Sequence, residues 1–337
     1  MGLFMSVLRF VSKDIINAMG YEIRRVPRAS DAAKAPVRSG DPITYQYMPR
    51  VRGSAVFEIR LEHARGLHTL GLRFDPAVHP FTRAAAAARA SERPTEALRE
   101  VLTAYYETVC PSTALDAVGL ESTFAPGLRG VPAAGWVFPW SDKSIAESMM
   151  GRQTALRMDA LQYGKMLPPS EGITAFGPVG SRKLELEISR LDKLIRSVAE
   201  HGFEPFNTKN PLKVIGLRRD KTYRWVVAAG HHRFAVCAAF AIPSVAAMVV
   251  DVVRREDCEY WPQVVTGVFS PRGALALFDR LYDGVPAPVC TGWAERAGRT
   301  APERADWPED HPGPRARTVD PTHPLTQHPI GRAKEWI

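Results

Sequence analysis

The amino-acid sequence predicts an α/β (α+β) protein, and three observations lead to this prediction. Of its 337 residues, 45% are hydrophobic and 24% charged, the balance of an ordinary globular chain. Residues 181–254 show the periodicities of a helix, two strands, a helix and a strand, in that order. The second of these helices follows a strand directly through the letters GHHR, at residues 230–233.

The length favours two domains, or one domain with large extensions. We expect an amphipathic helix at 1–28, a mixed α/β extension at 29–164 and an α/β domain at 165–290 that contains GHHR. Residues 291–337 are rich in proline and charge, so they are predicted to form a loosely ordered tail.

The first 28 residues place apolar side chains such as Leu3, Val7 and Phe10 at helical spacing, with charged residues between them. Charge interrupts the apolar run and no small-residue cleavage site follows, so a signal peptide is not expected. Two interpretations stay open. The helix packs on the protein's own core, or it lies on an anionic membrane or a partner.

Within the extension, alternating residues predict a strand at 54–63. Pro94 and a stripe of apolar residues predict a helix over 93–109. A Gly/Pro-rich irregular segment is expected at 111–139, followed by a helix at 144–161.

In the C-terminal half, Ser181 is the predicted N-cap of a helix that Gly202 ends. Strands are expected at 212–219 and 222–229, joined by a tight turn at Asp220-Lys221, and another strand at 244–253. Residues 234–250 carry no charge, but this run is shorter than the roughly 20 residues that cross a bilayer. It is predicted to be a buried helix followed by a buried strand.

The net charge is +8 and the pI is near 9.4, which favours an anionic partner such as nucleic acid, a nucleotide or an acidic membrane. The basic residues do not form Lys/Arg blocks, so a nucleic-acid-binding tail is not expected. The four cysteines are far apart and no pair has C-x-x-C spacing. This argues against a zinc ribbon or a redox dithiol and favours reduced cytoplasmic thiols.

The GHHR turn has the chemistry of a phosphate site. A helix that begins at the end of a strand exposes its first backbone N–H groups, and its dipole favours an anion there. Gly230 allows a phosphate to approach the backbone, and Arg233 can bind two phosphate oxygens. His231 and His232 can donate to phosphate or transfer a proton near neutral pH.

Two other interpretations of GHHR remain. The turn can be only a solvated basic corner, or the two histidines can be half of a metal site. The second needs another His/Asp/Glu cluster with ligand spacing, and the sequence does not show one. No metal ligand is therefore assigned.

Residues 170–256 resemble the ParB/sulfiredoxin superfamily. The turn and its helix match the pattern G-x-[HR]-R-x-x-A-x-x-x-x-x-[IV]-P through Gly230, Arg233 and Pro243. The preceding helix matches a second motif at Lys183, Arg190, Leu191, Leu194, Ser197, Val198, Gly202 and Phe203.

In that superfamily, the Gly-x-His-Arg turn binds nucleotide phosphates, and a lysine or glutamate near the first helix completes the site. The resemblance therefore implies a nucleotide cofactor (ATP, ADP or CTP) with Mg²⁺. It implies a phosphate-binding turn at Gly230, His231, His232 and Arg233, with Ser181 and Lys183 on the opposite wall.

The departures from the family pattern narrow the activity. Sulfiredoxins have a catalytic cysteine where this chain has His231, so sulfinic acid reduction is not expected. Relatives that phosphorylate a free amino acid have an aspartate where this chain has Ala229. A kinase of that kind would use Glu185 or Glu187 as its base, and His231 is a further candidate for proton transfer.

The segment after residue 256 shows no convincing helix-turn-helix, so chromosome partitioning is not expected. The leader INAMGYEIRRVP is similar to those of enzymes of bacterial surface-polysaccharide clusters. The leading hypothesis is a nucleotide-binding phosphotransferase for a small molecule or sugar. The alternative is a nucleotide-sensing or DNA-binding adaptor. Either would be cytoplasmic, with peripheral contact to the inner membrane if the first helix binds lipid.

Overall fold

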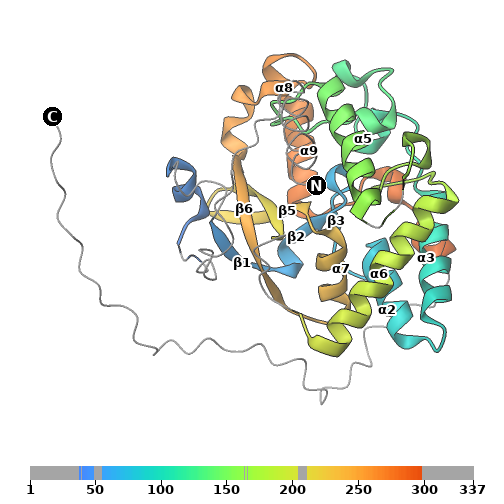
Figure 1. Ribbon diagram of the computed structural model, residues 1–337. Helices are drawn as coiled ribbons and strands as arrows, with labels where there is room; N and C mark the ends of the chain where they lie inside the picture. The colour runs from blue at the N-terminus through green and yellow to red at the C-terminus, as the bar shows by residue number, and fades with distance from the viewer. Residues whose placement is uncertain are drawn as a thin grey trace, which may run out of the picture.

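The computed structural model describes residues 38, 40–48, 55–162, 164, 166–203 and 211–297. The helix predicted at 1–28 lies outside these residues, as does the predicted tail beyond residue 297. The tail prediction is wrong for residues 291–297, where a short helix (Trp293–Arg296) buries Trp293 in the core. The described part is a mixed α/β structure built around one six-stranded sheet (Figure 1).

The sheet has the strand order β1-β6-β4-β5-β2-β3. Parallel and antiparallel pairs alternate across it, because β6 and β4 are parallel, as are β5 and β2, while the other neighbours are antiparallel. The strands are β1 (Val56–Arg60), β2 (Ala64–Gly66), β3 (Leu72–Arg73), β4 (Lys213–Arg219), β5 (Thr222–Ala229) and β6 (Ser244–Arg254).

The sheet takes strands from both sides of the boundary expected near residue 165. Strand β1 pairs with β6 along its whole length, and β2 pairs with β5. A mainly hydrophobic core of buried residues runs through both segments, from Ala55 to Ala297. Residues 55–164 therefore complete the sheet and core of the C-terminal half.

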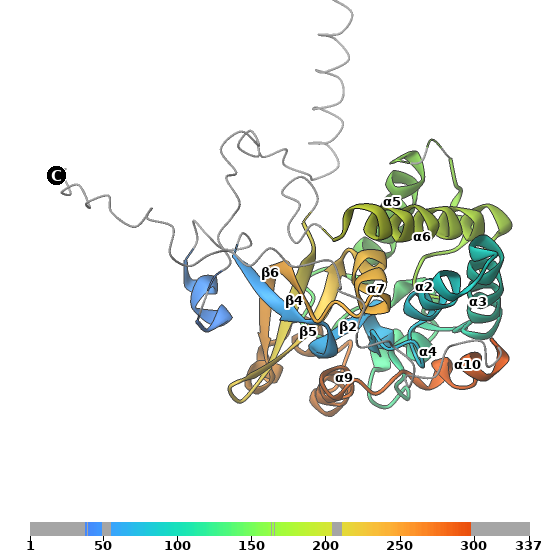
Figure 2. The ribbon, with the colours of Figure 1, turned by 90° about the horizontal axis from the view of Figure 1, so that it is seen from below.

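The helices cover the sheet and extend beyond one of its edges (Figure 2). They are α2 (Pro80–Ala90), α3 (Pro94–Thr108), α4 (Ala114–Val118), α5 (Ile145–Gln162), α6 (Ser181–His201), α7 (His231–Ala239), α8 (Pro262–Val265), α9 (Pro271–Asp283) and α10 (Trp293–Arg296). Short 3-10 turns connect several of them.

Helix α7 lies next to both α2 and α6, and α6 in turn packs on α3 (Figures 1 and 2). Small side chains allow this close approach. Helix α2 buries a run of five alanines, and Ala235 and Ala239 of α7 are almost fully buried. Phe234, also fully buried, fills the space between α7 and its neighbours. This packing fixes the beginning of α7 in space.

Most of the predicted elements are confirmed. Strand β1, helices α3 and α5, and the series from α6 to β6 lie where the sequence predicts them. The hairpin turns at Asp220, which has a φ of 57°, and α6 ends at Gly202. The uncharged segment is the buried helix α7 followed by β6.

The predicted N-cap at Ser181 is wrong by one residue. Gly180 is the N-cap of α6, and Ser181 is the first helical residue, with an exposed side chain. The capping acceptor comes from the preceding loop, where a carboxylate oxygen of Glu171 accepts the Lys183 backbone N–H at 3.1 Å. An acidic group is favoured at this end because the helix dipole is positive there.

Candidate functional site

Strand β5 ends at Ala229, and Gly230 turns the chain into α7. Gly230 is the N-cap and has a φ of 98°, in the left-handed region that favours glycine. A Cβ on this residue would lie 2.4 Å from Cδ2 of Leu212 and 3.1 Å from a guanidinium nitrogen of Arg233. Both the backbone conformation and the surrounding space therefore require glycine here.

Helix α7 begins without a side-chain cap. The first intrahelical bond is donated by Phe234 N–H to the Gly230 carbonyl at 3.0 Å. The N–H groups of His231, His232 and Arg233 precede it, so helix geometry gives them no intrahelical acceptor. They are donors for a bound anion.

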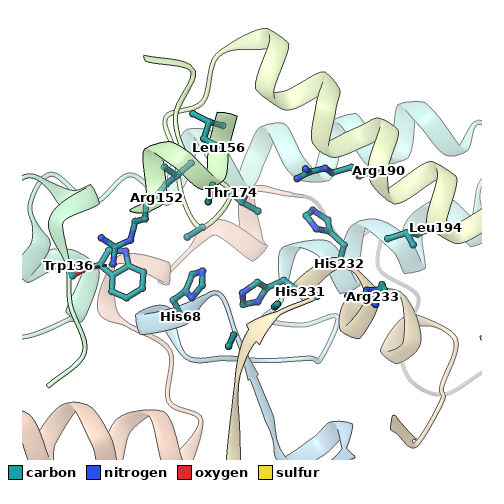
Figure 3. Close-up of a pocket in the computed structure, with 16 residues that line it drawn as sticks. His68, Trp136, Arg152, Leu156, Thr174, Arg190, Leu194, His231, His232 and Arg233 are labelled. Carbon is teal, nitrogen blue, oxygen red and sulfur yellow. Dashed lines mark hydrogen bonds between the residues drawn. The ribbon is translucent and has the colours of Figure 1, made fainter. Parts of the chain in front are cut away.

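A cavity of about 520 Å³ opens at this turn (Figure 3). Gly230, His231, His232 and Arg233 all line it. The other walls come from the loop before β3, the segment around Trp136, α5, the loop at 173–175 and α6. The cavity thus joins the GHHR turn to parts of the chain before residue 165.

Three arginines line the cavity and come from three different helices. They are Arg152 of α5, Arg190 of α6 and Arg233 of α7. No Asp or Glu is among the described residues that line it. Burial lowers the pKa of Arg233, and that of Arg152 to about 10, so both guanidinium groups stay charged at neutral pH. The walls are therefore strongly cationic.

Glu187 lies behind one wall of the cavity and binds the side chains that form it. It is fully buried, and it forms an ion pair with Lys183, one turn earlier on α6. Three cavity-lining side chains also bind it: Thr174 Oγ1 donates at 3.0 Å, His232 Nε2 at 2.5 Å and Arg190 Nη1 at 3.5 Å. A single carboxylate thus orients three groups that face the cavity.

The charge state of Glu187 follows from its neighbours. Burial alone would raise the pKa of its carboxyl, but the Lys183 ammonium, the His232 imidazole and the Arg190 guanidinium together hold this pKa well below its usual range. Glu187 is therefore a carboxylate at neutral pH. Its low pKa and lack of exposure make it a poor general base.

His231 lies in the wall as a neutral imidazole. Burial, with smaller contributions from His68 and His232, holds its pKa well below 6.5. The Leu67 backbone N–H donates to Nδ1 of His231 at 3.3 Å, which places the ring proton on Nε2. That buried Nε2 has no hydrogen-bond acceptor among the described residues. His231 is consequently a hydrogen-bond donor rather than a base.

His68 contacts His231 edge-to-face, with 4.6 Å between ring centroids. Burial, with a smaller contribution from Arg152, lowers the pKa of His68 to about 4. Leu67 and His68 have φ values of 53° and 57°, which are rare for residues other than glycine. Strained backbone of this kind is often found at functional sites.

The predicted site residues divide into three groups. Gly230, His231, His232 and Arg233 meet in the cavity. Lys183 and Glu187 lie behind the wall, where Lys183 Nζ also donates to Thr174 Oγ1 at 2.8 Å. Ser181 and Glu185 are not among the lining residues.

The expectation that Ser181 forms the opposite wall, or that Glu185 acts as base, finds no support in their positions. Ser181 is exposed at the start of α6. Glu185 is half-exposed on α6, where both of its oxygens pair with the guanidinium of Arg99 on α3.

Sequence reasoning missed Arg152, Arg190, Thr174, His68 and Trp136 as site residues. A signal for Arg190 was present, because Lys183, Glu187 and Arg190 follow i, i+4, i+7 spacing and so share one side of the helix beside its apolar stripe. The other four are distant in sequence from the GHHR turn, and no local pattern marks them.

The described residues hold no group of three or more His, Cys, Asp or Glu side chains that could bind a metal ion. The four cysteines are unpaired thiols, and Cys237 is fully buried in α7. Within the same part of the chain, no helix is both long and apolar enough to cross a membrane.

Comparison of the chain with protein family models, with curated proteins and with solved structures found no match.

Proposed function

We propose that this protein binds a nucleotide through its phosphates, in the cavity at the beginning of α7. One observation carries the proposal. The open N–H groups of α7 meet guanidinium groups from α5, α6 and α7 in one cavity, and no carboxylate of the described residues lines it. The sequence resemblance of residues 170–256 to the ParB/sulfiredoxin superfamily supports the same ligand class and suggests the same fold for that part.

Mg²⁺ has no carboxylate ligand set at this cavity among the described residues. The three arginines supply the positive charge that a divalent ion commonly provides to phosphates. Any Mg²⁺ would therefore arrive bound to the nucleotide, with its remaining ligands from water and phosphate. We infer that phosphate binding itself does not need the metal.

The His232–Glu187 pair favours phosphotransfer to a small molecule as a second, dependent function. Glu187 accepts the Nε2 proton of His232, so Nδ1 is the acceptor atom of the neutral ring. Stacking on Phe81, with ring centroids 4.5 Å apart, holds the ring in place. In this scheme His232 is the base and Glu187 is a positioning residue, which replaces the bases expected from the sequence.

The test is a thermal-shift panel of pyrophosphate, ATP, ADP, CTP and GTP, each with EDTA and with Mg²⁺. A ligand that binds only the folded state raises the melting temperature by mass action. We expect at least one phosphate ligand to stabilise the protein in EDTA, and Arg233→Ala to lose that stabilisation.

The matched control is Arg157→Ala, which removes an exposed arginine of α5 that does not line the cavity. It should respond to ligand as the unaltered protein does. If Arg233→Ala folds and keeps the full ligand response, the proposed site is wrong. If no phosphate ligand has an effect, the nucleotide proposal fails as a whole.

A further inference from the structure

The side of the cavity opposite the GHHR turn contains a second cation, Arg152, which comes from α5 and lies outside the span that resembles a known family. Figure 3 shows Arg152 and Trp136 at one side, with Arg190 and Arg233 at the other. The two cationic sides are separated by the space of the cavity.

Among the described residues, the groups that hold the guanidinium of Arg152 are neutral. Nη1 donates to the Ala134 carbonyl at 2.6 Å, and Nη2 donates to the Trp136 carbonyl at 2.5 Å. The guanidinium carbon lies 3.6 Å from the centroid of the Trp136 ring, so the plane stacks on the indole. These contacts fix the orientation of the cation without neutralising its charge.

Arg152 has no carboxylate partner among the described residues, and it is the electrostatic neighbour that helps lower the pKa of His68. Buried or half-buried charges in proteins are normally paired. By contrast Arg190, at the other side, pairs with Glu187. The charge of Arg152 is therefore available to a ligand.

Trp136 offers a second donor beside Arg152. Its side chain lines the cavity and is 5% exposed, and its buried indole Nε1 has no acceptor among the described residues. A buried donor without an acceptor costs free energy, which a bound acceptor recovers. Among the described residues, the wall thus combines a cation without a carboxylate partner with an N–H donor without an acceptor.

We propose that Arg152 and Trp136 form a second oxyanion subsite, so that the cavity takes a ligand or acceptor with an anionic group remote from the phosphate at α7. The chemical class is a phosphorylated acid or a bisphosphate. This inference rests on the proposed function, because one phosphate of the ligand binds at the beginning of α7. It deepens that function by assigning a second anionic group to the same ligand. A guanidinium binds carboxylate and phosphate oxygens alike, so the experiment separates the two.

The test compares matched ligands by isothermal titration in EDTA. At six-carbon length they are sorbitol 6-phosphate, 6-phosphogluconate and glucitol 1,6-bisphosphate, which differ only in the group at the far end. At three-carbon length they are glycerol 3-phosphate, 3-phosphoglycerate and glycerol 1,3-bisphosphate, which again differ only in the group at the far end. At one length or both, we expect the acid or the bisphosphate to bind at least about tenfold more tightly than the neutral-ended ligand. A charge-assisted hydrogen bond to Arg152 contributes this difference in affinity.

Variants assign this preference to its residue. Arg152→Gln should reduce it to about twofold or less, whereas Arg152→Lys, which keeps the charge, retains part of it. Arg157→Gln, an exposed arginine on the same helix, should keep the full preference. A preference for the acid identifies a carboxylate as the group that binds at Arg152, and a preference for the bisphosphate identifies a phosphate.

The proposal is overturned if the unaltered protein binds acid, bisphosphate and neutral-ended ligands equally at both lengths, a result that does not depend on any variant folding. It is also overturned if folded Arg152→Gln keeps the preference. Arg233→Ala separates this failure from that of the proposed function. It should weaken all six ligands alike, and an unchanged affinity there refutes the phosphate site at α7 while leaving the Arg152 result to stand by itself.

Discussion

At the scale of single residues, Glu187 contributes both to the stability of the fold and to the arrangement of the cavity wall. Its carboxylate is buried between Lys183 and Arg190, and it orients Thr174 and His232 at the cavity wall. Removing one member of a buried ion pair is costly because the remaining charge stays out of water without a partner.

We therefore expect Glu187→Gln to lower the free energy of unfolding by about 3–5 kcal/mol, which urea denaturation measures. Glu185→Gln on the same helix is the matched control. Its exposed pair with Arg99 should contribute less than about 1 kcal/mol. Equal losses for the two variants would contradict the organising role of Glu187.

Two histidines with lowered pKa values, His68 and His79, give a pH dependence of defined sign. Burial lowers the pKa of His68 to about 4 and that of His79 to about 3, below the value of 6.5 in an unfolded chain. Below pH 6.5 the unfolded chain binds these protons and the folded chain does not. Stability is therefore fully present above pH 6.5 and is lost as the pH falls toward 4 and 3.

His68→Asn removes one such group, and asparagine tolerates the left-handed backbone at this position. The stability of this variant should fall less steeply between pH 6.5 and 4, by up to about 1.4 kcal/mol per pH unit. Denaturation at a series of pH values checks this. A curve parallel to that of the unaltered protein would be the contrary result, and exposed His201→Asn serves as the control.

Residue-level reasoning from the sequence found the GHHR turn, because a glycine between a strand and a helix is a local signal. It did not find Arg152, Trp136 or His68, since only the tertiary fold brings them to the cavity. Lys183 was expected on the opposite wall and Glu187 as a base, but both are buried behind the wall and neither lines the cavity. Their roles were not predictable, because spacing alone does not show whether a charged side chain faces a cavity or lies behind its wall.

At the scale of elements, the beginning of α7 is the critical feature. Gly230→Ala introduces a Cβ both in a left-handed conformation and against Leu212 and Arg233. We expect a destabilisation of more than about 1 kcal/mol and a loss of phosphate affinity, because Arg233 must move. Thermal denaturation and pyrophosphate titration measure the two effects.

Gly267→Ala is a control for the backbone term alone. Gly267 has a φ of 77°, and no atom of the described residues lies within 4 Å of the position that a Cβ would take there. It should share the destabilisation but keep the affinity for pyrophosphate. If Gly230→Ala keeps that affinity as well, the turn does not position the site.

Element prediction succeeded where the periodicity was strong and failed where it was weak. The series from α6 to β6 was predictable from its apolar spacing and turn residues. Helix α2 was not identified, because its alanine run has no apolar stripe, and β2 and β3 are only three and two residues long. Such short strands exist because the neighbouring strand, here β5 for β2, supplies their partners.

At the scale of the whole molecule, the sheet joins residues that the sequence divided between two units. Strand β1 covers the edge of β6, and β2 extends the sheet beyond β5. The periodicity and the family resemblance placed a boundary near residue 165, but strand pairing over a long sequence separation leaves no local signal for such reasoning.

A fragment of residues 165–297 should therefore fail to fold. It would expose the edges of β5 and β6, and the apolar surface that α2 and α3 cover. Thermal denaturation followed by circular dichroism checks this. We expect the full-length chain to show a cooperative transition, and the fragment to show none and to aggregate. A fragment that melts cooperatively would show that residues 165–297 form a domain by themselves.

An anion bound where α7 begins, among Arg233, Arg190 and the open N–H groups, is what the proposed function requires first. The most direct measurement is the position of tungstate, a heavy phosphate analogue, located by anomalous X-ray scattering in crystals of the protein. We expect a tungsten peak at the beginning of α7, placed so that the tungstate oxygens lie within hydrogen-bond distance of the amides of residues 231–233 and of the Arg233 guanidinium. Tungstate bound only elsewhere, with this cavity empty, would contradict it.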